Sequence, residues 1–274
     1  MTDTTTSIDR LLDATRVDDV TFSFDVPDGW RQGRGAFGGL VVGAMVRAAT
    51  ALNDDDSRRV RSVTAELLGP VLPGRATLAV EKLRQGSGVS AVRVRLLQDS
   101  GTGVVEEQAC AVVVLAKSRP GTPSFQQRAV PHIPDVNSVD VVAVEPPLGP
   151  VFAGNFIFRP TGAFPFSGAT QATAAGFIQP KLPIAAVDAA VVAACADAWW
   201  PTLYATLDAP RPMATITFAL ELLIDPRELD PTLPLFHEAK SETAVDGYSV
   251  EHRALWTTDG RLVAENQQLF AIIR

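Results

Sequence analysis

Asp197 is the residue whose place in the sequence points most directly to chemistry. It lies near the C-terminal end of a long apolar segment, residues 184–200, that otherwise consists mainly of Ala, Val and Trp. A carboxylate at that end of a helix opposes the helix dipole, and burial makes its ionisation costly unless polar partners reach it. Such a group can orient or deprotonate a water molecule. The alternative is a partly exposed helix end with no role in chemistry.

A glycine-rich stretch precedes an earlier apolar segment, residues 37–52. Gly33, Gly35 and Gly38 fit the pattern G-x-G-x-x-G. A dinucleotide site requires a buried strand before this pattern and a parallel strand after the helix. The polar run PDGWRQ precedes the pattern and hairpin-like strands follow it, so no nicotinamide cofactor is predicted. We interpret the glycines as a loop that lets the backbone approach a ligand at a helix N-terminus.

Other catalytic and metal-binding patterns are missing from the sequence. It has no G-x-S-x-G, no H-E-x-x-H and no Cys/His cluster, so we expect neither a metal nor a cofactor. His132, His237 and His252 are scattered and are interpreted as structural or surface residues. Cys110 and Cys195 lie within apolar runs, so we predict that both are buried and unpaired.

Composition limits the classes of partner. The 274 residues carry a net charge of −7, which argues against nucleic acid as a main partner, although a local basic patch can still receive an anionic ligand such as a nucleotide. The polar N-terminus does not resemble a secretory signal. No uninterrupted apolar run reaches the ~18 residues of a membrane span. The composition therefore predicts a cytoplasmic enzyme or binding protein.

The pattern of elements occurs twice. A long apolar helix is predicted at 37–52 and again at 184–200, and each is followed by four strand-like runs joined by hairpin turns. The first half has strands at 20–26, 60–68, 75–83, 89–98 and 104–116, and the second at 214–224, 233–243, 248–257 and 262–273. Hairpin after hairpin indicates an antiparallel sheet. We predict an α+β fold in which each long central helix is wrapped by an antiparallel sheet.

A Pro-rich segment separates the two halves. Residues 118–150 contain prolines that interrupt every periodic pattern, and this is typical of a linker that runs over the surface. The predicted organisation is therefore an N-terminal repeat at 1–117, a linker at 118–150 and a C-terminal repeat at 151–274.

The two halves differ at positions that bear on chemistry. Aligning their helices and strands gives three corresponding pairs: Arg47 with Asp197, Ser62 with Thr215, and Cys110 with Gln268. The second half thus has Asp, Thr and Gln where the first has Arg, Ser and Cys, so the acid and the amide occur in the second half alone of these aligned positions. A slip in this alignment would substitute Thr217 or Gln267, and a shift of one residue turns a strand side chain to the other face.

At these residues the chain resembles the acyl-CoA thioesterase II family, whose fold is a double hotdog. The residues that carry the resemblance are Trp30 with Gly38-Gly39, Ala196-Asp197-Ala198-Trp199, Ala214-Thr215-Ile216, and Leu262-Val263-Ala264 with Gln268. The resemblance implies that Asp197, Thr215 and Gln268 hold the water that attacks a thioester carbonyl. Leu40 and the pair Thr217-Phe218 differ from the residues common in that family.

The activity that the resemblance implies is hydrolysis of acyl-CoA to fatty acid and CoA, without metal or cofactor. Backbone N–H groups of Gly38 and Gly39 are the expected oxyanion donors. One alternative is a non-catalytic acyl-CoA or lipid-binding protein of the same fold. Another is a hotdog hydratase or dehydratase, in which an Asp acts with a His, but no His aligns near Asp197. The oligomeric state stays open between a monomer and a homodimer.

Overall fold

The computed structural model describes residues 6–99 and 101–273. The elements of the N-terminal half are α1 (Ile8–Leu11), β1 (Thr15–Arg16), β2 (Thr21–Val26), η1 (Asp28–Trp30), β3 (Arg31–Gln32), β4 (Gly35–Ala36), α2 (Gly38–Thr50), β5 (Arg58–Leu67), β6 (Gly74–Gln85), β7 (Val89–Asp99) and β8 (Val105–Lys117). Those of the C-terminal half are η2 (Val136–Ser138), η3 (Val151–Asn155), β9 (Phe156–Pro160), β10 (Ala172–Pro180), α3 (Ala189–Asp197), η4 (Thr202–Thr206), β11 (Met213–Leu222), η5 (Pro226–Glu228), β12 (Leu235–Val245), β13 (Tyr248–Trp256) and β14 (Leu262–Ile272).

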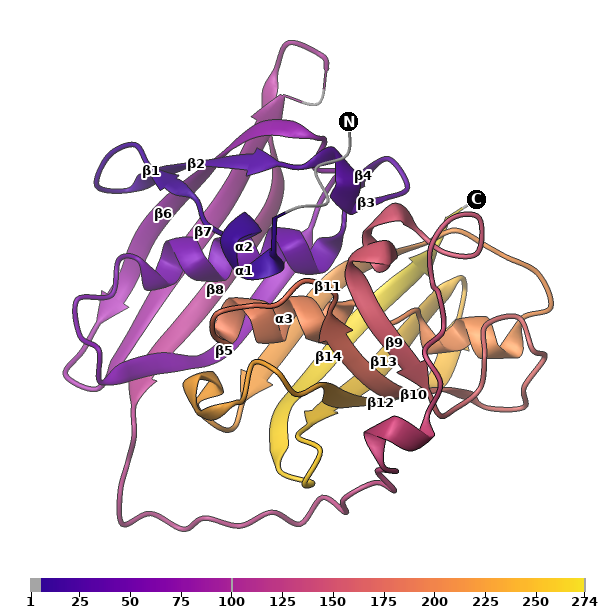
Figure 1. Cartoon of the computed structure of the whole chain (residues 1–274). Helices are drawn as coiled ribbons and strands as arrows, with labels where there is room; N and C mark the ends of the chain where they lie inside the picture. The colour runs from indigo at the N-terminus through magenta and orange to yellow at the C-terminus, as the bar shows by residue number, and fades with distance from the viewer. Residues whose placement is uncertain (1–5, 100, 274) are drawn as a thin grey trace.

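One antiparallel sheet runs through both halves. In the described part of the chain it has twelve strands, in the order β1-β2-β6-β7-β8-β5-β11-β14-β13-β12-β10-β9 (Figure 1). The halves meet where β5 pairs antiparallel with β11, from Ser62 opposite Glu221 to Glu66 opposite Thr217. Continuous backbone hydrogen bonding across this junction makes the two halves one structural unit. The predicted antiparallel sheet is confirmed.

The two longer helices lie on the same side of the sheet and pack against each other (Figure 1). Their contact uses glycines of α2. A Cβ atom on Gly39 would lie 2.9 Å from Ala194 Cα, and one on Gly43 would lie 3.1 Å from the Ala190 carbonyl oxygen. Only residues without a side chain allow such close approach of two helix backbones. Among the described residues, none of the helices is both long enough and apolar enough to pass through a lipid bilayer.

The prediction for the second helix is wrong at both ends. Helix α3 begins at Ala189 because Asp188 caps it, its side chain accepting a hydrogen bond from the Val191 N–H at 2.9 Å. It ends at Asp197 because Pro201 favours extended backbone just before it. The apolar run of 184–200 is therefore longer than the helix within it, and Asp197 is its last helical residue.

Alternation of apolar and polar residues places the strand side chains as expected. In β7, Val92 and Val94 are buried whereas Arg93 and Arg95 are exposed. In β8 the same rule turns Cys110 to the outer face, where its Sγ lies 3.4 Å from a carboxylate oxygen of Glu66. Cys110 is only partly buried, so its predicted burial is wrong.

The segment 118–150 is irregular apart from η2 and a single bridge from Val142 to Phe158. Ile133, Val136 and Val139 pack against a small hydrophobic cluster of the second half made by Phe177, Phe236, Ala254, Trp256 and Leu262. Arg128 forms ion pairs with Glu265 at 2.6 Å and Glu238 at 3.6 Å. These contacts fasten the segment to the C-terminal half.

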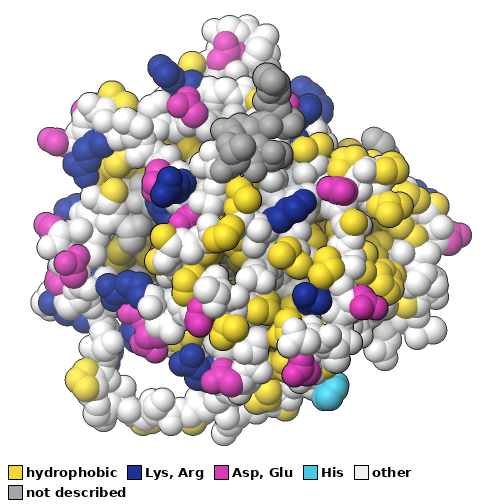
Figure 2. Space-filling model, in the orientation of Figure 1, with side chains coloured by type: hydrophobic (Ala, Val, Ile, Leu, Met, Phe, Trp, Pro, Cys, Tyr) yellow, Lys and Arg dark blue, Asp and Glu magenta, His cyan; other side chains and the backbone are white. Residues whose placement is uncertain are grey.

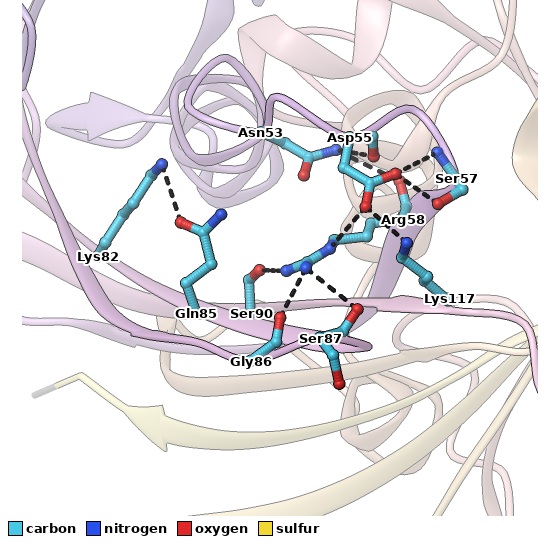
Figure 3. Close-up of polar contacts among 10 residues, drawn as sticks. All are labelled: Asn53, Asp55, Ser57, Arg58, Lys82, Gln85, Gly86, Ser87, Ser90 and Lys117. Carbon is cyan, nitrogen blue, oxygen red and sulfur yellow. Dashed lines mark hydrogen bonds and ion pairs between the residues drawn. The ribbon is translucent and has the colours of Figure 1, made fainter.

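A buried arginine ties together one end of the N-terminal half (Figure 3). The Arg58 guanidinium donates to the carbonyl oxygens of Gly86 at 2.6 Å and Ser87 at 3.4 Å, and to the Ser90 hydroxyl. It also pairs with Asp55 at 3.2 Å. Arg58 thus joins the start of β5 to the β6–β7 turn.

We expect Arg58→Met to destabilise the fold, because the carbonyls of Gly86 and Ser87 and the buried Ser90 hydroxyl lose their donor. The loss is about 1–3 kcal/mol, measured as a lower midpoint of urea unfolding. Lys82→Ala is the matched control, since its exposed side chain donates to Gln85 in the same region and does not touch Arg58 (Figure 3). Equal midpoints for both variants would contradict this role of Arg58.

Candidate active site

The carboxylate of Asp197 lies between the end of α3 and the start of α2. It is 7% exposed and accepts hydrogen bonds from the backbone N–H of Gly39 and from the Gln268 side chain. The approach to α2 is close, because a Cβ on Gly38 would lie only 2.8 Å from Asp197 Oδ2. The interpretation of Asp197 as a partly exposed helix end is therefore wrong.

Burial dominates the electrostatics of this carboxyl and raises the pKa of Asp197 above its ordinary 3.8. The positive charge of Arg253 acts in the opposite direction, and so do the hydrogen bonds from Gln268 and Gly39. The negative charge of Glu251 raises the pKa further. A carboxyl whose pKa is raised by burial is a stronger base than an exposed one, which suits proton transfer from water.

Thr215 faces the same interior because β11 contains a β-bulge. The pairing of β11 with β14 shifts between Thr215 and Thr217. Met213 and Thr215 before the bulge point inward, and so do Phe218 and Leu220 after it. One extra residue therefore reverses the alternation.

A chain of hydrogen bonds fixes the amide of Gln268. The Thr215 hydroxyl donates to Gln268 Oε1 at 3.2 Å, and Gln268 Nε2 donates to Asn266 Oδ1 at 2.9 Å. Asn266 Nδ2 in turn donates to the Ala219 carbonyl at 2.7 Å. Because Gln268 is fully buried and Gln267 is exposed, the structure brings Gln268, and not its neighbour, to Asp197.

A cavity of about 300 Å³ adjoins these groups, and both Asp197 and Thr215 line it. Much of its wall is aromatic and comes from segments far apart in the sequence: Phe152, Trp199, Trp200, Tyr204 and Phe270. Exposed Gln32, Gly33 and Pro212 also line it, and they mark the side on which it reaches solvent. A small apolar pocket with a few polar groups at one place is typical of a small-molecule site.

The three glycines of the G-x-G-x-x-G pattern have separate reasons to be glycine. Gly33 has φ of +65° and begins the two-residue turn of the β3–β4 hairpin, as in a type II′ turn. A Cβ on Gly35 would lie 3.0 Å from Pro70 Cα. Gly38 is confined by Asp197. The glycines of this pattern are therefore explained by the β3–β4 turn and by the close contacts of Gly35 with Pro70 and of Gly38 with Asp197.

Gly38→Ala is expected to lower kcat without loss of the fold. The added Cβ would meet Asp197 Oδ2 at 2.8 Å and Leu67 Cδ1 at 3.1 Å, so the carboxylate must move. A displacement of a catalytic group by about 1 Å can lower the rate by about 100-fold. Gly88→Ala is the control, because nothing lies within 4 Å of its Cβ position. Equal rates for Gly38→Ala and the control, in a reaction that depends on Asp197, would show that the carboxylate position does not matter.

A buried ion pair behind the site was not predicted from the sequence. Arg253 and Glu251 are each 1% exposed and their side chains lie 2.7 Å apart. Arg253 donates to the carbonyl oxygens of Ala196 at 2.8 Å and Trp199 at 3.4 Å, which flank Asp197 in the chain. Glu251 accepts from the backbone N–H and hydroxyl of Thr202 at 2.7 and 2.8 Å. The pair thus fastens the segment that carries Asp197.

His237 lies under the aromatic wall of the cavity. Its ring stacks on Trp199 with centroids 5.1 Å apart, and it is fully buried. Burial and the nearby positive charge of Arg253 lower the pKa of His237 well below 6.5, so the ring is neutral. His237 is therefore an interior residue and not a surface one.

The corresponding residues of the first half do not form a second site of this kind. Arg47 joins the end of α2 to the start of α3 through Asp188 at 2.8 Å, and it also pairs with Asp13. Ser62 lies at the β5–β11 junction and Cys110 on the outer face. The acid, hydroxyl and amide come together only in the second half of the described chain.

Comparison with known proteins supplies the family. Residues 26–116 match the model of the acyl-CoA thioesterase N-terminal domain, and residues 126–272 match that of the acyl-CoA thioesterase C-terminal domain. A search of curated proteins found no match.

Solved structures share the fold at low sequence identity. A conserved hot dog-fold protein of unknown function from Alicyclobacillus acidocaldarius has a TM-score of 0.87 at 22% identity, over 97% of this chain and 98% of its own. An acyl-CoA thioesterase II from Mycobacterium marinum has a TM-score of 0.77 at 16% identity, over the same shares. Because the family models span most of the sequence, the chain belongs to the acyl-CoA thioesterase family.

Proposed function

We propose that the chain is a tandem double hotdog, with repeats at 1–117 and 151–274 joined by the linker 118–150. In this arrangement α2 and α3 are the central helices, and β5–β8 and β11–β14 are the sheets that wrap them. The pairing of β5 with β11 supports the proposal, because it joins two similar sets of strands into one sheet.

We further propose that the protein hydrolyses acyl-CoA thioesters to free fatty acid and CoA. The observation that carries this proposal is a buried carboxylate, Asp197, beside Thr215 at the wall of an apolar cavity. A protein that only binds lipid has no need to bear the cost of a buried carboxyl with a raised pKa. This cost favours catalysis over the non-catalytic alternative.

In the proposed mechanism, Asp197, Thr215 and Gln268 hold the attacking water. The Thr215 hydroxyl donates its proton to Gln268 Oε1, so its lone pairs are free to accept one hydrogen of the water. The carboxylate of Asp197 accepts the other, which leaves an oxygen lone pair for the thioester carbonyl. Gln268 keeps both groups in place.

The chemical step follows from this geometry. The water oxygen bonds to the carbonyl carbon while its proton passes to Asp197. The tetrahedral intermediate then breaks its carbon–sulfur bond, and the departing sulfur takes the proton from Asp197 as CoA thiol. We assign the developing oxyanion to the Gly38 N–H at the start of α2, where a helix lacks intrahelical acceptors. The Gly39 N–H, which donates to Asp197, holds the base as the charge shifts.

Release of free CoA from short-, medium- and long-chain acyl-CoAs tests the function. We expect turnover of at least one chain length by the wild-type protein, and the aromatic cavity restricts which one. Binding of acyl-CoA without any CoA release over the whole panel would favour the non-catalytic alternative.

The rate of hydrolysis should depend on pH through Asp197. Because burial raises its pKa above 3.8, the carboxylate is lost as pH falls through that raised value. We therefore expect kcat/KM to fall on the acid side with a midpoint above 3.8, measured where the protein stays folded. A midpoint at or below the value of an exposed aspartate would contradict the assignment of Asp197 as base.

A further inference from the structure

Two arginines stand next to the residues at which the site cavity reaches solvent. Arg34 follows Gln32 and Gly33, and Arg211 precedes Pro212; those three neighbours line the cavity and are exposed. Both arginine side chains are exposed as well. They come from distant parts of the sequence, so the fold itself brings two cations to one opening.

Neither arginine has an acidic partner in the part of the chain that the structure describes. Among residues 6–99 and 101–273, Arg34 and Arg211 have no ion pair and no hydrogen bond from their side chains. Arg31 in the same hairpin differs, since it pairs with Asp28 at 2.9 Å. Asp208 lies three residues before Arg211 but forms no ion pair with it. In a chain with a net charge of −7, these two cations stand next to residues that line the cavity opening.

The backbone that carries each arginine is ordered. Gly33 with φ of +65° makes the tight β3–β4 turn whose tip is Arg34, and the Ala36 N–H donates to the Val71 carbonyl at 2.7 Å. Near Arg211, the Ile273 N–H donates to the Pro212 carbonyl at 2.8 Å. The hairpin and the C-terminal end of β14 lie at the same edge of the molecule (Figure 1). The two cations are therefore presented by fixed segments.

We propose that Arg34 and Arg211 bind phosphate groups of the nucleotide part of CoA. This inference rests on the proposed function: with the thioester carbonyl at Asp197, the thiol-side part of the substrate leaves through the opening that the two arginines flank. Guanidinium groups bind phosphate through charge-assisted hydrogen bonds in a matching planar geometry. The pair gives an acidic protein a site for a highly anionic substrate.

The distribution of charge on the surface is consistent with a phosphate site confined to the cavity opening. On the face shown in Figure 2, Lys and Arg are intermixed with Asp and Glu, and do not form a broad basic surface. A broad surface would attract any polyanion. Two arginines at one cavity instead select a small anionic ligand.

Thioesters of one acyl group with CoA, 4′-phosphopantetheine and pantetheine test the proposal. For the double variant Arg34→Ala/Arg211→Ala we expect KM for acyl-CoA to rise about 10- to 100-fold with kcat unchanged. Kinetics with acyl-pantetheine, which has no phosphate, should be the same in variant and wild type. Arg75→Ala is the control, an exposed arginine on β6 whose substitution should leave KM unchanged.

Three results would overturn the proposal: no rise in KM for acyl-CoA, an equal rise for acyl-pantetheine, or a wild type that does not prefer acyl-CoA over acyl-phosphopantetheine. The third result would mean that the protein does not bind the nucleotide part of CoA. Calorimetric titration of CoA against wild type and variant reads the same site without turnover. The two proposals can fail separately. If the wild type hydrolyses no thioester but binds CoA, and the double variant does not bind CoA, then the proposed hydrolysis is refuted and the phosphate-binding role of the two arginines stands.

Discussion

Asp197→Asn is expected to lower kcat for acyl-CoA hydrolysis by about 10²- to 10⁴-fold, the usual contribution of a general base. The amide has the shape of the carboxylate and can still accept from the Gly39 N–H, but it cannot take a proton from water. KM should change little, because the cavity and its aromatic wall are retained. The measurement is CoA release under single-turnover and steady-state conditions.

The same variant should fold at least as well as the wild type at neutral pH. A carboxyl whose pKa is raised by burial binds more protons in the native than in the unfolded state between pH 3.8 and its raised value. Its contribution to stability therefore declines as pH rises through that window. Asparagine removes this dependence. A variant that is both unfolded and inactive would leave Asp197 with a structural role only, contrary to our account.

Arg253→Met is expected to produce the largest loss of stability. It removes the partner of Glu251, which is 1% exposed, and the donor to the Ala196 carbonyl. Leaving an uncompensated charge in the interior costs about 3–5 kcal/mol, measured by urea unfolding. The rate of hydrolysis should also fall, because the Arg253 guanidinium holds the segment that carries Asp197.

The double variant Glu251→Gln/Arg253→Met separates the two effects. It removes both buried charges, and glutamine can still accept from the Thr202 N–H. Most of the stability should return, since replacing a buried pair by neutral groups is often close to neutral. An equally unstable double variant would mean that the cost of Arg253→Met does not come from the unpaired charge of Glu251.

The sheet and the first helix could be predicted from the sequence because their side chains obey simple periods. Alternation in β7 and the apolar run of α2 each report a buried face directly. The second helix could not be bounded in this way. Its start depends on the Asp188 cap, and an apolar run continues beyond both of its ends.

Which strand side chains point into the site could not be predicted from the alternation of apolar and polar residues, because a β-bulge changes it. The bulge in β11 turns Thr215 inward although Phe218, of opposite parity, is also buried. In β13 the pattern misleads further, since Val250 is exposed while the charged Glu251 and Arg253 are buried. The one available signal was the pairing of opposite charges two residues apart on one strand face.

The cavity itself was beyond sequence reasoning, because its wall comes from five separated segments. Residues near 32, 150, 200, 213 and 270 meet only after the hairpin, the linker and η4 have packed around the end of α3. The resemblance to a family pointed to Asp197, Thr215 and Gln268. The partners that orient them, Asn266 and Arg253, came from the structure.

A crystal structure with a ketone analogue of acyl-CoA, in which a methylene group replaces sulfur, tests the central claim most directly. We predict one ordered water within about 3 Å of Asp197, Thr215 or Gln268 oxygen atoms, facing the carbonyl carbon, with the Gly38 N–H directed at the carbonyl oxygen. An analogue carbonyl bound away from Asp197, or a water held by other groups, would contradict the account.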